Sequence, residues 1–331
     1  MPDLASPLVA APLAVLVALA LDRALGEPPA RWHPVVGMGR YLSFMGQRIA
    51  PRVDASDAPD ACNAKVARTF WLGALAWCLG AAGVAVLATV LVGLAASWAW
   101  WLQALALGVL LKPMLAWRML RDEVRAVEGA LSESLPAGRA RLAWLVSRDV
   151  SALDASQVRE SAIESLAENL NDSVVAPLFW FAVAGLPGAA LYRFANTADA
   201  MWGYRGARNG FDWTWAGKWA ARADDVLSWV PARITAVLLG VPAWLAGARG
   251  LRTLPAQARQ TPSPNSGWPM AAMALALNVR LGKPGVYALH REGRSPQAAD
   301  TAQALRLAGR VVQLLAMAAL LWAALAWWFT P

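Results

Sequence analysis

Four acidic side chains recur at intervals of four residues directly before an apolar run. They are Glu160, Glu164, Glu168 and Asp172. Positions four apart on an α-helix differ by only about 40° around the axis, so the four carboxylates share one face. Like charges at this spacing repel by about a few tenths of a kcal/mol per pair in water, and by more where water is scarce. The stripe therefore predicts a positive partner, which is either a solvated arginine such as Arg148 or Arg159, or a bound cation.

Two later clusters combine acids with amides and arginines, and a glycine-rich loop lies between them. Their residues are Asn196, Asp199, Arg205, Arg222, Asp224, Asp225 and Arg233. Oxygen donors without a thiolate set, in a chain with only two histidines, are typical of a Mg²⁺ site and not of a zinc site. Together with a glycine-rich loop and guanidinium groups, they indicate Mg²⁺ that bridges phosphate oxygens. The alternative is a set of solvated charges.

A turn rich in serine and asparagine precedes an apolar helix that we expect to run from Gly267 toward Gly282. The first backbone N–H groups of a helix have no partner within the helix and can bind an anion. Ser263, Asn265 and Gly267 are therefore candidates for an anion site, although an ordinary helix cap has the same pattern. His33, near the end of a polar stretch, is a further candidate ligand.

The composition indicates a membrane protein, since 58% of the 331 residues are hydrophobic and only 16% are charged. About 20 apolar residues are needed for a helix to cross the hydrocarbon core. A 42-residue run without an ionisable group must hold two spans, with a turn near Ala95–Trp98. The first apolar segment has an alternative interpretation as a signal peptide. Four full spans are predicted at 4–21, 70–93, 98–117 and 311–329.

Two further apolar stretches, 174–195 and 227–248, contain prolines and, in one case, an arginine, so we expect broken or re-entrant helices there. The predicted fold class is all-α: a polytopic helical membrane protein in which residues 1–331 form one membrane-embedded domain. Its polar, helical loops are expected at 22–69, 118–173, 196–226 and 249–310.

Lysine and arginine are absent from residues 1–21 and from the residues after Arg310, and they are frequent in 23–68 and 112–159. This bias predicts a multi-pass protein of the cell (inner) membrane, with both termini outside and the loops cytoplasmic. Six spans are the alternative if both broken stretches cross. The net charge of +8 is then explained by loops near anionic lipid, and no nucleic-acid partner is expected.

The order of five sequence blocks between about Leu21 and Tyr287 resembles the CobD/CbiB family of membrane-bound adenosylcobinamide-phosphate synthases. The blocks are "LDRALGEPP…WHPV", "SRDVSALD…ESAIESLAENLNDSVVAPLF", "NTADAMWGYR", "ARADDVLSWVPARIT" and "SPNSGWPMAAMALALNVRLGKPGVY". This chain departs modestly from the family pattern at Glu27, Arg205 and Ser228, where charge or polarity is preserved.

The resemblance implies an amide-forming ligase of cobalamin biosynthesis. Its substrates would be the corrinoid adenosylcobyric acid and aminopropanol or aminopropanol phosphate. ATP is the implied co-substrate and Mg²⁺ the implied ion, and a complex with other corrinoid-pathway enzymes is a further expectation. A membrane transporter and a Mg²⁺-dependent polyprenyl-type transferase are the alternatives.

Read in terms of this chemistry, the residues divide into three groups. Glu164, Glu168, Asp172 and Asp225 are the predicted catalytic acids, and Asp172, Asn196, Asp199 and Asp224 the predicted metal ligands, with Asn169 as a neutral helper. The predicted substrate or phosphate ligands are His33, Arg205, Arg222, Arg233, Ser263, Asn265 and Gly267. Glu160 is expected on solvated surface. Trp180, Trp202 and Trp229 are candidates for the wall of a corrin cleft.

Overall fold

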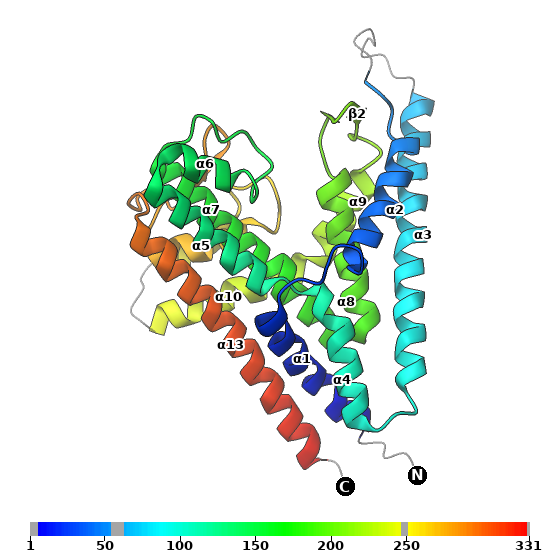
Figure 1. Cartoon of the computed structure of the whole chain (residues 1–331). Coiled ribbons are helices and arrows are strands. Elements are labelled where there is room, and N and C mark those ends of the chain that lie inside the picture. Colours follow the sequence, from blue (N-terminus) through cyan, green and yellow to red (C-terminus); the bar gives the residue numbers. More distant parts are fainter. Residues whose placement is uncertain (1–5, 54–62, 246–250, 330–331) are drawn as a thin grey trace.

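The protein is built almost entirely of helices, in a computed structural model that describes residues 6–53, 63–245 and 251–329 (Figure 1). In chain order the helices are α1 (Ser6–Leu25), α2 (Pro34–Ile49), α3 (Asn63–Ala95), α4 (Trp100–Leu111), α5 (Trp117–Glu133), α6 (Leu135–Leu142), α7 (Ala155–Leu170), α8 (Ala176–Trp202), α9 (Lys218–Leu227), α10 (Trp229–Leu245), α11 (Leu254–Ala258), α12 (Gly267–Leu277) and α13 (Ala298–Trp328).

Short elements connect these helices. Two are 3₁₀ turns and one is a π turn, and four short strands form two antiparallel hairpins. They are η1 (Lys112–Met114), η2 (Asn171–Val175) and η3 (Leu251–Thr253), with β1 (Ala207–Arg208) paired to β2 (Phe211–Asp212) and β3 (Leu281–Lys283) paired to β4 (Tyr287–Leu289). The predicted all-α class is confirmed.

Four helical stretches of the described chain are long and apolar enough to cross a bilayer, and the bent pair α9–α10 makes a fifth if it counts as one span. They are Ala64–Ala95, Trp100–Glu133, Ala155–Trp202 and Ala298–Trp328; α1, at the predicted span 4–21, is not among them, and Ala155–Trp202 contains the stretch 174–195 predicted as broken. Large apolar side chains such as Leu87 on α3 and Leu321 on α13 are mostly exposed, as expected for faces that contact lipid. The predicted polytopic membrane protein is confirmed.

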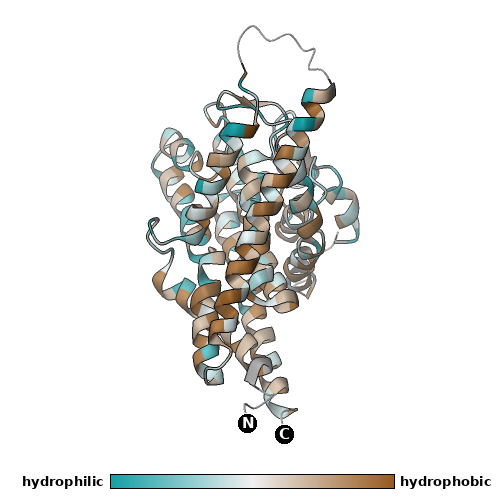
Figure 2. Cartoon of the chain, turned by 90° about the vertical axis from the view of Figure 1, so that its right-hand side faces the viewer, coloured by the Kyte–Doolittle hydropathy of each residue, from teal (hydrophilic) through white to brown (hydrophobic). Residues whose placement is uncertain are grey.

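Hydrophobic and polar segments separate along the length of the molecule. The start of α1, the connection from α3 to α4 and the end of α13 lie at one end, whereas α6 and the β1–β2 hairpin lie at the other (Figure 1). Figure 2 shows hydrophobic residues along the helices and hydrophilic colours gathered at the end opposite the termini. Both terminal helices thus have their outer ends on the same side of the molecule.

The predicted break within 174–195 is confirmed, whereas the stretch 227–248 bends only at its start, because α10 runs through Pro231, Arg233 and Pro242 without a break. In α8, Ala184 and Gly185 leave the helical conformation just before Pro187, and Gly185 has a φ of 63°, which glycine adopts without strain. Helices α9 and α10 meet at Ser228 with a bend of 47°. The last residues of the predicted stretch 227–248 lie outside the described residues.

Two boundaries differ from those expected. The segment 98–117 is not one helix, because α4 ends at Leu111 and η1 intervenes, where Pro113 has no N–H to donate. Helix α12 ends at Leu277, well before Gly282, because Asn278 adopts a left-handed conformation. The chain then enters the β3–β4 hairpin.

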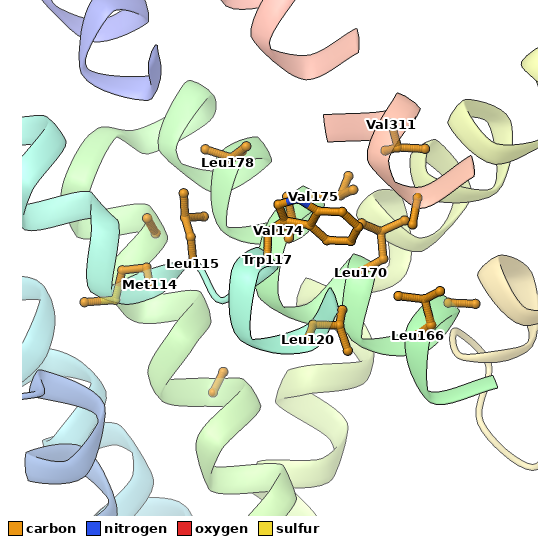
Figure 3. Packing of buried hydrophobic residues seen from close by; sticks show 14 of the residues in the cluster. Met114, Leu115, Trp117, Leu120, Leu166, Leu170, Val174, Val175, Leu178 and Val311 are labelled. Carbon is orange, nitrogen blue, oxygen red and sulfur yellow. The ribbon is translucent and has the colours of Figure 1, made fainter. Parts of the chain in front are cut away.

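The central core lies where α5, α7, η2 and α13 meet (Figure 3). Trp117, Leu170, Val174 and Val311 pack there and are almost fully buried. A second cluster under α6, which includes Val127 and Val158, packs the start of α7 against α5. These contacts fix α7, which carries the acidic stripe, between two other helices.

Helix α2 approaches α8 closely at Gly46. A Cβ atom added to Gly46 would lie 2.7 Å from both Trp202 Nε1 and Trp213 Cη2, whereas one added to Gly37 would meet nothing within 4 Å. The Trp202 indole N–H donates to the Leu42 carbonyl oxygen (3.2 Å), and its ring stacks on Trp213. The end of α8 is therefore held rigidly against α2.

Candidate functional site

A cavity of about 440 Å³ opens where four separate segments meet. Helix α7 contributes Glu168, η2 contributes Asp172, α8 contributes Asp199, and α9 contributes Asp224 and Asp225. The turn before α12, residues 262–266, forms another side of the same cavity. Acids far apart in the sequence thus line one space.

Most of the predicted site residues lie in or beside this cavity. Those that line it are Glu168, Asp172, Asp199, Arg205, Asp224, Asp225, Ser263 and Asn265. Asn196 donates a long hydrogen bond to Asp224 Oδ1 (3.5 Å). Glu164 lies one turn before Glu168, buried and ion-paired with Arg148 (3.6 Å). The structure therefore brings together residues from all three predicted groups.

The five acids in the cavity have no ion-pair partner within 4 Å among the described residues. Asp224 is close enough to Asp172 and Asp199 for the three charges to repel one another. Arg205 is exposed at the cavity and attracts Asp225 from a longer distance. Uncompensated like charges around one cavity raise the free energy of the folded protein, and binding of a cation between them is therefore favoured.

Asp172 is oriented by neighbours that sequence reasoning did not identify. It accepts hydrogen bonds from Asn171 Nδ2 (2.8 Å) and, at 3.4 Å, from the Tyr192 hydroxyl, which also contacts Ser228 Oγ (3.1 Å). Thr235 of α10 donates to Asn171 Oδ1 (2.9 Å). The only signal in the sequence is a lone polar residue within an apolar run, as at Tyr192 and Thr235.

The start of α7 has a capping box, in which Asp154 and Gln157 satisfy each other's backbone N–H groups. Glu160 is not on solvated surface, so that expectation is wrong. Its side chain is only 5% exposed and pairs with Arg280, 3.1 Å away and 120 residues later in the chain. Arg159 pairs with Glu128 (2.8 Å) and does not neutralise the stripe.

The donor atoms fit Mg²⁺ bound with water and phosphate better than a metal held by the protein alone. No group of three or more His, Cys, Asp or Glu side chains is arranged to hold a metal ion in the parts of the chain that the structure describes. Mg²⁺ commonly keeps several waters and uses only one or two carboxylates together with substrate phosphates. The carboxylates of Asp172, Asp199 and Asp224 are suited to that mode.

The turn before α12 is held by its own side chains. Ser263 Oγ accepts hydrogen bonds from the N–H groups of Asn265 (3.2 Å) and Ser266 (3.3 Å). Arg233 donates to Asn265 Oδ1 (3.0 Å) and lies over the rings of Trp229 and Trp268. Arg233 thus supports the turn from behind and is not among the residues that line the cavity.

Known proteins resemble this chain over most of its length. A family model described as "CobD/Cbib protein" matches residues 15–325. The chain belongs to the CobD/CbiB family. A relative in Chromobacterium violaceum, named cobalamin biosynthesis protein CobD, is 39% identical over 93% of each chain. One of the same name in Stutzerimonas stutzeri is 42% identical over 92% of this chain and 96% of its own.

The likeness extends to archaea. A protein of Methanothermobacter thermautotrophicus named probable cobalamin biosynthesis protein CobD is 40% identical over 83% of this chain and 85% of its own. No solved structure matches the chain.

Like Arg233, the predicted ligands Gly267, Arg222 and His33 of this CobD/CbiB chain are not among the residues that line the cavity. Arg222 is exposed on α9. His33 caps α2 by accepting from the Val35 N–H (3.2 Å), and its other ring nitrogen lies 2.9 Å from Glu27 Oε2. Lys112 reaches Glu27 Oε1 (3.2 Å) and Asp22 Oδ1 (3.5 Å). These four residues form an ion cluster that connects the ends of α1 and α4.

The cluster also sets the charge of Glu27. Burial opposes ionisation there, but the hydrogen bond with His33 and the positive charge of Lys112 together hold the pKa of the Glu27 carboxyl below its usual value of 4.5.

The three predicted wall tryptophans differ in their surroundings. Trp202 is 2% exposed and faces Trp213, and Trp180 donates to the Leu227 carbonyl oxygen (3.0 Å). Trp229 is 53% exposed. Only Trp229 presents most of its ring to the surroundings.

Proposed function

We propose that this member of the CobD/CbiB family is an enzyme of cobalamin biosynthesis that joins adenosylcobyric acid to aminopropanol or aminopropanol phosphate. The observation that carries the proposal is the cavity in which five carboxylates meet without an ion-paired cation in the described chain, beside an exposed arginine and a serine-rich turn. The names of the relatives support the pathway. The resemblance described above supports the substrates.

The reaction needs an activated carboxylate. Transfer of the γ-phosphoryl group of ATP to a corrinoid carboxylate oxygen gives an acyl phosphate and ADP. The amine nitrogen then attacks the carbonyl carbon, the C–N bond forms, the C–O bond to phosphate breaks, and inorganic phosphate leaves. A base takes the proton that the nitrogen loses.

The residues divide this work by their positions. Mg²⁺, when bound, would neutralise charge on phosphate oxygens, and one or two carboxylates from the set Asp172, Asp199 and Asp224 would hold it, with Asn196 beside them. Glu168 lines the cavity and has no ion pair in the described chain, whereas Glu164 is paired with Arg148. We therefore assign the proton acceptor to Glu168.

The phosphate ligand is assigned in the same way. Arg205 lies at the cavity beside Asp225 and is exposed, so its guanidinium is free to bind a phosphate of ATP or of the amino alcohol. Asp225 completes the polar wall there.

The test uses the purified full chain in detergent with cobyric acid, aminopropanol phosphate, ATP and Mg²⁺. We expect one amide product and one ADP per turnover, and a loss of at least about 100-fold in kcat for Glu168→Gln, the magnitude typical of a lost general base. Glu292→Gln, on an exposed side chain outside the cavity, is the matched control. Full turnover in excess chelator would refute the metal assignment, and corrinoid uptake into vesicles without amide formation would indicate a transporter.

We also propose that the chain resides in the inner membrane with the cavity on the cytoplasmic side. The β1–β2 hairpin is next to Arg205 of the cavity, and Gly206, which has a φ of 118°, directly precedes its first strand. A reporter inserted there should read as cytoplasmic. A periplasmic signal would place the acids on the other face and require six spans.

A further inference from the structure

A second and larger hollow, of about 1110 Å³, lies between α1, α5 and α13, away from the acidic cavity. Its inner part is apolar and is formed by Leu16 and Leu19 of α1 with Val312 and Ala316 of α13. Its outer part is basic. Five arginines line it: Arg23, Arg121, Arg125, Arg306 and Arg310. We call this hollow the α1–α13 groove.

The positive charge of the groove is compensated only in part, by the ion pairs of Arg121 (2.9 Å) and Arg125 (3.7 Å) with Asp122. Among the described residues, no acid forms an ion pair with Arg23, Arg306 or Arg310. Glu128 is the only acid that lines the groove, and its carboxylate is occupied by Arg159 and by the Thr301 hydroxyl (2.7 Å). An anion that enters the groove therefore meets cations and no free carboxylate.

Three of these arginines share one level relative to the apolar segments. Arg23 follows the apolar part of α1, Arg310 directly precedes the apolar run of α13, and Arg306 lies one turn before Arg310. A rise of about 1.5 Å per residue places each of these positions within about one or two turns of the hydrocarbon boundary, where phospholipid headgroups lie. The apolar inner part continues from that level between α1 and α13, and many large apolar side chains of α13 are exposed, as expected beside lipid.

We propose that the α1–α13 groove binds an anionic phospholipid of the bilayer. Its phosphate would contact the guanidinium groups of Arg306 and Arg310, which lie four residues apart on one face of α13, and its acyl chain would lie against Leu16, Leu19 and Val312. Basic pockets between membrane helices on the cytoplasmic side bind acidic headgroups in this way. The inference does not depend on the reaction at the acidic cavity.

The experiment measures lipid binding to the full chain by native mass spectrometry in detergent, with phosphatidylglycerol, phosphatidylcholine and inorganic phosphate as separate probes. We expect phosphatidylglycerol to bind at least about tenfold more tightly than phosphatidylcholine. The double variant R306Q/R310Q should lower the affinity for phosphatidylglycerol by about 30-fold, since each basic residue near the headgroups contributes about fivefold to the affinity. The matched control is K65Q/R68Q, which removes two exposed charges at the start of the apolar run of α3, outside the groove.

A steric variant separates the groove from general surface charge. Gly309→Leu keeps every arginine and projects a side chain into the groove, where a Cβ has room because its nearest neighbour, Trp117 Cζ2, lies 3.8 Å away. This variant should also bind phosphatidylglycerol more weakly than the wild type does. Equal binding of the two lipids, an equal loss in K65Q/R68Q, or displacement of phosphatidylglycerol by millimolar inorganic phosphate would each overturn the proposal.

Discussion

Replacing Asp224 by asparagine should stabilise the metal-free protein while it lowers activity. Two carboxylates about 8 Å apart repel by about 2 kcal/mol at an effective dielectric constant of about 20. Asp224 is close enough to Asp172 and Asp199 to be repelled by either one, and the gain expected here is that from one ionised neighbour. The asparagine side-chain oxygen can keep the long hydrogen bond from Asn196. We expect a gain of about 2 kcal/mol, or roughly 2–4 °C in the melting temperature of a chain of this size.

The assay compares melting temperatures in detergent with chelator and with saturating Mg²⁺. At 100 times the Kd, binding stabilises the wild type by about 2.7 kcal/mol, whereas a variant whose lost ligand weakens the Kd about 100-fold gains only about 0.4 kcal/mol. The order of stability should therefore reverse when Mg²⁺ is added. Glu292→Gln should change neither value. If Asp224→Asn melts below the wild type in chelator, the carboxylates do not repel one another as argued and the reasoning fails.

Three further predictions concern packing and charge. Gly46→Ala should lower the melting temperature by several degrees because its methyl group overlaps two indole rings, whereas Gly37→Ala on the same helix should be neutral; equal effects would contradict this. Arg280→Gln should lower the free energy of unfolding by about 1–2 kcal/mol more than Glu160→Gln does, because it leaves the buried Glu160 carboxylate without a cation. The opposite order in denaturant titrations would refute the pairing. Glu27→Gln should destabilise the protein at pH 7. Because the pKa of the Glu27 carboxyl is lowered in the folded state, its ionised form stabilises the fold fully above the ordinary value of 4.5, and this stabilisation is lost as the pH falls through the lower, folded-state pKa. The melting temperatures of the variant and the wild type should therefore converge in acid.

Features that depend on local sequence were predictable. The turn after Ala95, the capping box at Asp154 and the break near Pro187 each follow from residues a few positions apart. Their physical causes, which are loss of an N–H, a side-chain cap or a glycine conformation, act within one or two helical turns.

Features that depend on the order of helices in space were not predictable. The carboxylate of Glu160 looks solvated in sequence because its partner, Arg280, lies 120 residues away. His33 looks like a ligand in sequence because nothing local shows that its ring pairs with Glu27, which Lys112 also contacts. The roles of the acids in the cavity stay predictions, although their common position follows from the structure.

The π turn at Asn171–Val175 has a consequence for how this site could arise or be lost. A π turn contains one residue more than the α-helical turn it replaces, and each residue on an α-helix advances the direction of side chains by about 100°. Deleting a single residue here would turn all of α8, including Asp199, away from Glu168 while leaving the hydrophobic content and the length of the span almost unchanged. A membrane helix of the same composition could thus pass between having and lacking this cavity through one insertion.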